Sequence, residues 1–174
     1  MKKVFLLLTP VIYLLISCGN SKTNETTSSV PGMKEVQLKI NGNPLSIMVP
    51  SDSTKGKLEI VLQQWGATEI TLGKDFKIAI EEGAGDIQLT KNDISNDEVF
   101  KLKRYLKDEP TLLFWESKNA DLPDSKFHFY MINKIGAVSY IIKDIENGDS
   151  FNEKAIQTMI DAAKTLKVST KSNS

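Results

Sequence analysis

The sequence predicts an α+β fold, with a mostly antiparallel sheet of about six or seven strands packed by two main helices. Several short segments alternate apolar and polar residues at the two-residue period of strands, and short turn signals join neighbours, which favours antiparallel pairing. Two other segments follow a capping box, a Ser with a Glu three residues later. All of these segments lie within residues 34–169, so we expect one domain with one core.

The first element is a predicted hairpin over residues 34–50. Asn41-Gly42 is the strongest turn signal in the chain, because both central positions of a type I′ turn need positive φ. With these two residues as the loop, Leu38 lies opposite Leu45, and the other apolar residues of the two strands also meet on one face. The sequence therefore predicts both the hairpin and its register.

Further strands are expected on either side of a first helix. Residues 57–72 contain two alternating pieces separated at Gly66, and the alternation continues over 75–82. After the helix, strand-like segments follow at 111–117, 126–133 and 137–144. The last two segments are joined by a short turn, so we expect them to pair antiparallel.

The first helix is expected between Ser95 and Pro110. Ser95 and Glu98 form a capping box, apolar residues follow at helical spacing, and the proline marks the stop. A shorter helical turn is expected before it, around residues 86–92.

The second helix is expected after Ser150 and Glu153, which form the other capping box. Its apolar stripe begins at Ile156 and should pack on the sheet. The strand pair FHFYMIN and AVSYIIKD, followed by SFNEKAIQTMIDAAKTLK, resembles the closing part of the PsbP-like sandwich. That resemblance implies a scaffold with a binding role, and it transfers no functional residue.

The start of the chain has the pattern of an export signal. Lys2 and Lys3 precede an uncharged apolar run over residues 4–16, which is too short for a bilayer-spanning helix of ~20 residues but typical of a signal peptide. The segment LISC, which ends at Cys18, resembles the lipobox of bacterial lipoproteins. The resemblance implies that residues 1–17 are removed and that acyl chains are attached to the sulfur and the new amine of Cys18.

Lipidation of Cys18 would make the membrane a partner of this chain, because two or more acyl chains give stable anchoring. In Gram-negative lipoproteins an Asp after the lipidated Cys favours retention in the inner membrane. Gly19 stands there, so the resemblance implies the outer membrane, with the domain on its periplasmic face or at the cell surface. Residues 18–33 are rich in Ser, Thr, Asn and Gly and are expected to form a disordered tether, and residues 170–174 a tail.

The charge balance of the mature chain excludes one class of partner. The whole chain has 22 basic and 22 acidic residues, so loss of Lys2 and Lys3 with the signal peptide leaves 20 basic residues and a net charge of −2. Nucleic-acid binding requires a strongly basic surface, so no nucleic acid is expected. With a single cysteine, no intramolecular disulfide can form.

Three carboxylates that follow a predicted strand are the candidates for acid–base catalysis. Glu81, Glu82 and Asp86 flank a Gly-Ala-Gly turn, and paired carboxylates perform glycoside hydrolysis. They are also ordinary surface residues beside a turn, and no aromatic sugar platform accompanies them. A glycan or peptide hydrolase is therefore the alternative, and the favoured interpretation is that the protein is not an enzyme.

The only histidine, His128, has no catalytic motif around it. In a strand it lies on the face opposite Phe127 and Phe129, so we expect a partly exposed sheet residue. Zinc and other metal motifs are absent from the sequence, and no metal or cofactor is expected.

Trp65 and Trp115 are the best candidates for ligand contact, although large aromatic residues in strands more often serve packing. Together these observations predict a non-catalytic binding or assembly module. It would either hold a ligand on one sheet face or dock another envelope protein.

Overall fold

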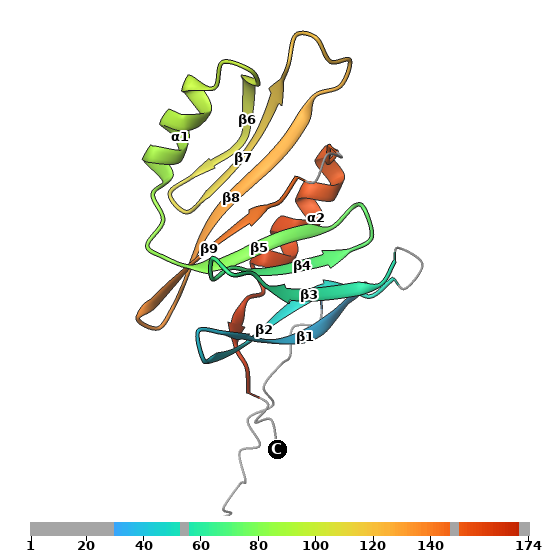
Figure 1. The fold of residues 1–174 in the computed structure, drawn as a ribbon, viewed down its shortest axis with the longest axis vertical. Helices are drawn as coiled ribbons and strands as arrows, with labels where there is room; N and C mark the ends of the chain where they lie inside the picture. The colour runs from blue at the N-terminus through green and yellow to red at the C-terminus, as the bar shows by residue number, and fades with distance from the viewer. Residues whose placement is uncertain (1–29, 53–55, 147–149, 171–174) are drawn as a thin grey trace, which may run out of the picture.

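The computed structural model describes residues 30–52, 56–146 and 150–170. The signal peptide, Cys18 and almost all of the tether and tail lie outside the described residues, so those expectations stay predictions. The described chain forms ten strands and two helices in an α+β arrangement, as the sequence predicted (Figure 1).

The larger sheet contains seven strands that pair antiparallel throughout, in the spatial order β3-β4-β5-β9-β8-β7-β6. In chain order these strands are β3 (Leu58–Leu62), β4 (Thr68–Leu72), β5 (Lys77–Glu82), β6 (Lys101–Glu109), β7 (Leu112–Lys118), β8 (Lys126–Ile135) and β9 (Val138–Asp144). All of them except β6 coincide, within two residues at either end, with segments that the sequence predicts as strands. The antiparallel pairing was therefore predicted correctly, whereas the seven strands of this sheet include β6, which was predicted as a helix.

A smaller sheet of three strands lies beside the larger one, in the order β1-β2-β10. Its strands are β1 (Met33–Ile40), β2 (Asn43–Pro50) and β10 (Lys167–Val168). The predicted hairpin register is confirmed, with Leu38 opposite Leu45. Asn41 and Gly42 both have positive φ, 48° and 86°, as a type I′ turn requires. The sequence predicted one sheet, so the separation of this hairpin from the larger sheet was missed.

Helix α2 (Glu153–Ala163) lies against both sheets (Figure 1). Asn152 caps it, with its side-chain oxygen accepting from the backbone N–H of Ala155 at 2.9 Å. The predicted cap at Ser150 was therefore wrong by two residues. Six side chains of α2 are buried, and the helix contacts β8, β9 and β2. The helix fills the space between the two sheets and forms the centre of the core.

Helix α1 (Ile87–Asn96) ends where the first helix was predicted to begin. Asp86 caps it through a 2.9 Å hydrogen bond from the backbone N–H of Leu89. Residues 101–109 instead form β6, so the predicted helix after Ser95 was wrong. Two irregularities in the pairing of β6 with β7 insert extra residues, and this spacing of apolar positions resembles a helical period.

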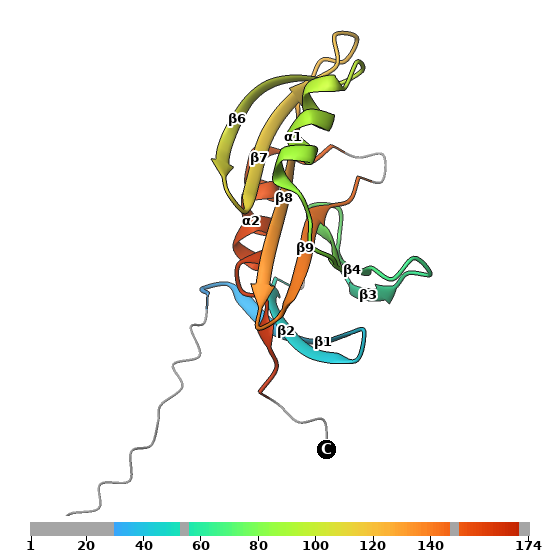
Figure 2. The same ribbon diagram turned by 90° about the vertical axis from the view of Figure 1, so that its left-hand side faces the viewer.

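The two helices cover opposite faces of the larger sheet (Figure 2). Successive residues of a strand point to opposite faces. In β8, Phe129 and Met131 belong to the buried core on the α2 side, whereas His128 lies on the other face, under α1. The residues that alternation assigned to the core are therefore confirmed, and His128 is left facing a second, less completely covered side.

Candidate functional site

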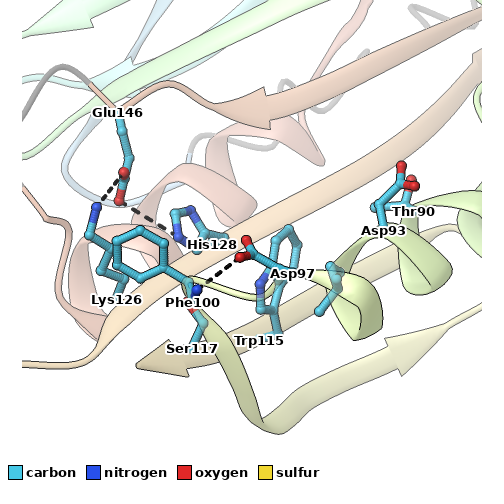
Figure 3. A pocket seen from close by; sticks show the side chains of 10 residues that line it. Thr90, Asp93, Asp97, Phe100, Trp115, Ser117, Lys126, His128 and Glu146 are labelled. Carbon is cyan, nitrogen blue, oxygen red and sulfur yellow. Dashed lines mark hydrogen bonds and ion pairs between the residues drawn. The ribbon is translucent and has the colours of Figure 1, made fainter. Parts of the chain in front are cut away.

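A cavity of about 380 Å³ lies beneath α1 (Figure 3). Side chains from α1, the segment between α1 and β6, strands β7 and β8, and the chain just after β9 line it. They are Thr90, Asp93, Ile94, Asp97, Phe100, Trp115, Ser117, Lys126, His128 and Glu146. The volume is at the small end of the ~300–1,000 Å³ range of ligand pockets.

The floor of the cavity is built from alternate residues of two neighbouring strands. Trp115 of β7 lies opposite His128 of β8, and their rings are 5.3 Å apart at an angle of 32°. Ser117 follows two residues after Trp115 and lies opposite Lys126. The four side chains therefore share one face, because the strand period is two residues.

Helix α1 is held over this floor by contacts with β6. Lys91 forms an ion pair with Asp108, with Nζ to Oδ2 at 2.6 Å, and Lys91 also lies over the Tyr105 ring at 5.4 Å. At the start of the helix, Gly85 has φ 65°, and a Cβ there would be 2.8 Å from the side chain of Ile132. Only glycine allows the chain to pass this close to β8.

His128 lies between two carboxylates. Its Nδ1 is 2.8 Å from Oδ2 of Asp144, and its Nε2 is 3.6 Å from Oε1 of Glu146. Asp144 is fixed in turn, because its Oδ1 accepts the backbone N–H of Phe129 at 2.8 Å. Burial alone would lower the pKa of His128, but the hydrogen bond to Asp144 and the charges of Asp144 and Glu146 outweigh it and raise that pKa above its ordinary value.

One wall of the cavity is an aromatic ring beside an ion pair. Lys126 donates to Oε2 of Glu146 at 2.6 Å, and its Nζ lies 4.3 Å from the centre of the Phe100 ring. Asp97 orders the segment before this ring, since its Oδ1 accepts the backbone N–H groups of Val99 and Phe100 at 2.8 Å (Figure 3). The wall is therefore fixed by polar contacts rather than by burial in the core.

Two buried oxygen atoms on this cavity lack hydrogen bonds in the part of the chain that the structure describes. They are Oγ of Ser117, a residue that is 3% exposed, and Oε1 of Glu146. The 3.6 Å separation of the latter from His128 is too long for a hydrogen bond. Buried polar atoms are almost always paired, so two such atoms on one cavity indicate a place where another molecule supplies the partner.

None of the carboxylates predicted as catalytic candidates lines this cavity. Glu81 pairs with Lys143 at 3.1 Å, and Glu82 accepts from the side chain of Asn41 at 3.0 Å. Asp86 serves as the cap of α1. Each of the three therefore has a separate contact within the fold, and the hydrolase alternative stays a prediction.

The two tryptophans lie in different places. Trp115 lines the cavity, and its contact with a ligand stays a prediction. Trp65 lies between β3 and β4, is 56% exposed, and has Lys143 at 5.9 Å from its ring centre. It stands near an exposed apolar strand, where Leu62 is 66% exposed.

Sequence reasoning missed the acidic partners of His128. Asp144 is the last residue of a predicted strand and Glu146 follows it, but nothing local placed either beside the histidine. The two-residue strand period was a signal that could have identified Ser117, because it assigns Ser117 to the same face as Trp115. The interpretation of His128 as a partly exposed sheet residue agrees with its side-chain exposure of 18%.

The arrangement favours binding over nucleophilic catalysis. The pair of Asp144 and His128 has the geometry that orients an imidazole, but Nε2 faces a carboxylate, and Ser117 makes no hydrogen bond to it within the described chain. Among the described residues no group of three His, Cys, Asp or Glu side chains is arranged to hold a metal ion. Within the same residues, no helix has the length and apolar character to span a membrane.

Comparison with known proteins gives no relative from which a role could be transferred. No family model matches the chain, and no curated protein and no solved structure matches it either. The fold and the site by themselves define the class of the protein. It is an α+β protein with a small polar and aromatic cavity on one face of its larger sheet.

Proposed function

We propose that this chain is a lipid-anchored protein of the bacterial cell envelope that binds a small molecule in the cavity beneath α1 and does not act as an enzyme. The lipobox-like segment at Cys18, with the charged and apolar regions before it, supports the anchor. Gly19 supports the outer membrane as its location, on the periplasmic face or at the cell surface. The cavity supports the binding role.

The observation that carries the binding role is the pair of buried oxygens without partners among the described residues, Ser117 Oγ and Glu146 Oε1. An unpaired buried polar group costs about 1–3 kcal/mol, and a bound ligand, ion or water that supplies the missing partner removes that cost. The half-buried ring of Trp115 adds the apolar surface that small-molecule sites usually contain.

Fluorescence of Trp115 tests the binding role directly. A Trp65→Phe variant of the full chain leaves Trp115 as the only tryptophan, and it can be titrated with benzylamine, benzyl alcohol and benzoate. At least one of these probes should change the emission with a Kd of about 1 mM or below, as expected for ligands of this size. A Ser117→Leu variant, which fills the cavity, should abolish the response. A flat titration with all three probes would reject the proposed binding role.

Fractionation tests the anchor independently. Cys18→Ser should move the protein from the membrane pellet to the soluble fraction and remove the added mass of the acyl chains. Ser21→Ala, a neighbouring change outside the lipobox, should do neither. Gly19→Asp should move the protein from the outer to the inner membrane on a density gradient. A Cys18→Ser protein that pellets unchanged would contradict the lipoprotein assignment.

Assembly with another envelope protein is the second candidate, and the exposed edge of β3 favours it. Strand β3 is an outer strand of the larger sheet, and Ile60 and Val61 are 42% and 48% exposed. A free edge of this kind can pair with an extended segment of a partner protein. Antiparallel pairing of two copies centred on Ile60 would place both Glu59 side chains diagonally on one face, which disfavours a second copy.

A photo-crosslinking residue at position 61 tests this docking surface. It should give one identified heterologous crosslink in envelopes, and Ile60→Lys should abolish it. The control has the photo-crosslinking residue at position 89 instead. Leu89 is also exposed, but it lies on α1. A crosslink only to a second copy, or the same crosslinks from both positions, would reject docking at β3.

The relation to the PsbP-like sandwich also stays a proposal. It is supported by the order of elements at the end of the chain, where the β8–β9 pair is followed by α2 packed on the same strands. An experimental structure that superposes on that fold over both sheets would establish it, and a different strand order would reject it.

A further inference from the structure

We propose that the cavity beneath α1 selects a small organic cation with N–H donors, such as a primary amine, an amidine or a guanidine. This inference deepens the proposed function and rests on it. It depends on three features of the cavity, namely its charge, the hydrogen-bonding character of its unpaired atoms and its aromatic surface.

The cavity carries more negative than positive charge. Its lining contains three carboxylates, Asp93, Asp97 and Glu146, against Lys126 and His128. Asp144 lies behind the histidine and adds a fourth carboxylate. Even with His128 protonated, four negative charges therefore face two positive ones. An anionic ligand would meet net repulsion, and a cationic ligand would meet net attraction.

Both positive side chains of the cavity already bond a carboxylate of the protein, whereas one of the negative side chains has no such partner within the described residues. Lys126 bonds Glu146 and lies over Phe100, and His128 bonds Asp144. Asp93 lines the cavity and makes no hydrogen bond or ion pair within the described residues. The charge left for a ligand is therefore negative.

Both unpaired buried oxygens can accept a hydrogen bond from a ligand. A carboxylate oxygen such as Glu146 Oε1 accepts hydrogen bonds, and the Ser117 hydroxyl can accept them as well. An ammonium or guanidinium group offers several N–H donors at once, whereas a quaternary ammonium offers none. The orphaned acceptors therefore favour a protonated amine over a fully methylated one.

Trp115 supplies the third feature. Cations are attracted to the face of an aromatic ring, and tryptophan is the strongest of the three aromatic residues in this respect. The ring of Phe100 already has the Lys126 ammonium beside it. Trp115 has the His128 ring 5.3 Å from its own on one side but lines the cavity, so it is the aromatic contact proposed for the ligand. An inorganic cation is disfavoured, because no group of three candidate ligands is assembled among the described residues.

The three probes of the fluorescence titration separate this inference from the proposed function, because they share a ring and differ in head group. Benzylamine should bind about 10-fold more tightly than benzyl alcohol, and benzoate should not bind detectably. Equal binding of all three would leave the binding role standing and overturn the selection of a cation. The absence of binding by any probe would reject both.

Matched variants test which side chains give the selectivity. Asp93→Asn and Asp97→Asn should each weaken benzylamine binding about 3-fold without affecting benzyl alcohol, since only the charge is removed. Asn keeps an oxygen for the backbone contacts that Asp97 makes. Glu98→Gln removes the same charge from the neighbouring position outside the cavity and should have no effect. An equal loss in Glu98→Gln would overturn the assignment of selectivity to the cavity.

Ser117→Ala tests the donor requirement. It should weaken benzylamine binding about 5-fold, since one hydrogen bond is lost. Tetramethylammonium, which has no N–H group, should compete with benzylamine poorly and equally in the variant and in the parent. Strong competition by tetramethylammonium would overturn the need for N–H donors.

Discussion

The two faces of the larger sheet differ in how completely they are covered. On one face, α2 buries six side chains between two sheets, and the space is filled by apolar residues. On the other face, α1 buries only Ile94, and the space beneath it is a cavity with charged walls. The same strands form both faces, because their residues alternate. The comparison shows that β7 and β8 contribute to the hydrophobic core with one face and form the floor of the candidate site with the other.

The largest expected difference between the faces is the cost of removing a buried isoleucine. Ile156→Ala in α2 should lower the free energy of unfolding by about 3–4 kcal/mol, because the enclosed core cannot collapse around the void. Ile94→Ala in α1 should cost only about 1–2 kcal/mol, because Ile94 already borders an open cavity. Urea unfolding of both variants measures the two values, and equal costs would contradict the comparison.

The glycine that leads into α1 should be the next most sensitive position. Gly85→Ala should destabilise the protein by about 2–3 kcal/mol, because it combines a positive φ with a clash against Ile132. Gly136→Ala is the matched control, with φ 63° and no atom within 4 Å of the added Cβ. It should cost about 1 kcal/mol, the conformational part alone. Thermal unfolding of the pair separates the clash from the strain.

At low pH, the protein should lose stability through protonation of Glu116, which lies on the α2 side of the larger sheet. Hydrogen bonds from Lys103, Ser125 and Arg104 lower the pKa of Glu116 from 4.5 to about 2. A lowered pKa means that the stabilisation is present above the ordinary value and is lost as the pH falls from 4.5 through about 2. The melting temperature should therefore fall over that window. In the Glu116→Gln variant, the fall in melting temperature over this window should be smaller, because the titrating carboxyl is gone. Glu109 is an exposed glutamate, and the Glu109→Gln variant should show the same fall as the parent protein.

As the pH rises, the protein should lose stability through deprotonation of His128, which lies on the α1 side of the larger sheet. The pKa of His128 is raised despite burial, because Asp144 and Glu146 outweigh the opposing charge of Lys126. Stabilisation by a raised pKa is complete below the ordinary histidine value and is lost as the pH rises through the folded-state value. His128→Asn, which removes the only histidine, should abolish this loss near neutral pH. An unchanged pH profile of the melting temperature would contradict the contacts described for His128.

The smallest expected loss of stability follows removal of the unpaired hydroxyl. Ser117→Ala should leave the free energy of unfolding unchanged or raise it, because no hydrogen bond within the described chain is lost and an unpaired buried polar group is removed. Ser46→Ala provides the contrast, since Ser46 is fully buried but donates to Glu35 at 2.9 Å. It should cost about 1–2 kcal/mol. A similar cost for both serines would show that Ser117 has a partner.

Local sequence signals were reliable where neighbouring residues along the chain determine the structure. The turn at Asn41-Gly42 needed only its own two residues, and it correctly gave the hairpin register. The alternation of β8 likewise assigned His128 and Phe129 to opposite faces from their adjacent positions alone. Local signals failed at Ser95, because Ser95 lies in the last turn of α1, where its hydroxyl donates to the Lys91 carbonyl. The apolar spacing after it is that of a bulged strand rather than of a helix.

The sequence by itself determined the α+β class, the strand alternation and the apolar stripe of α2, since each depends on periods that repeat within one segment. Only the tertiary structure decided that residues 101–109 pair with β7 as a strand and that α1 covers the opposite face from α2. It also decided that Asp144 and Glu146 meet His128. These arrangements depend on contacts between residues far apart in the chain, and the pairing of whole strands, rather than any local pattern, fixes them.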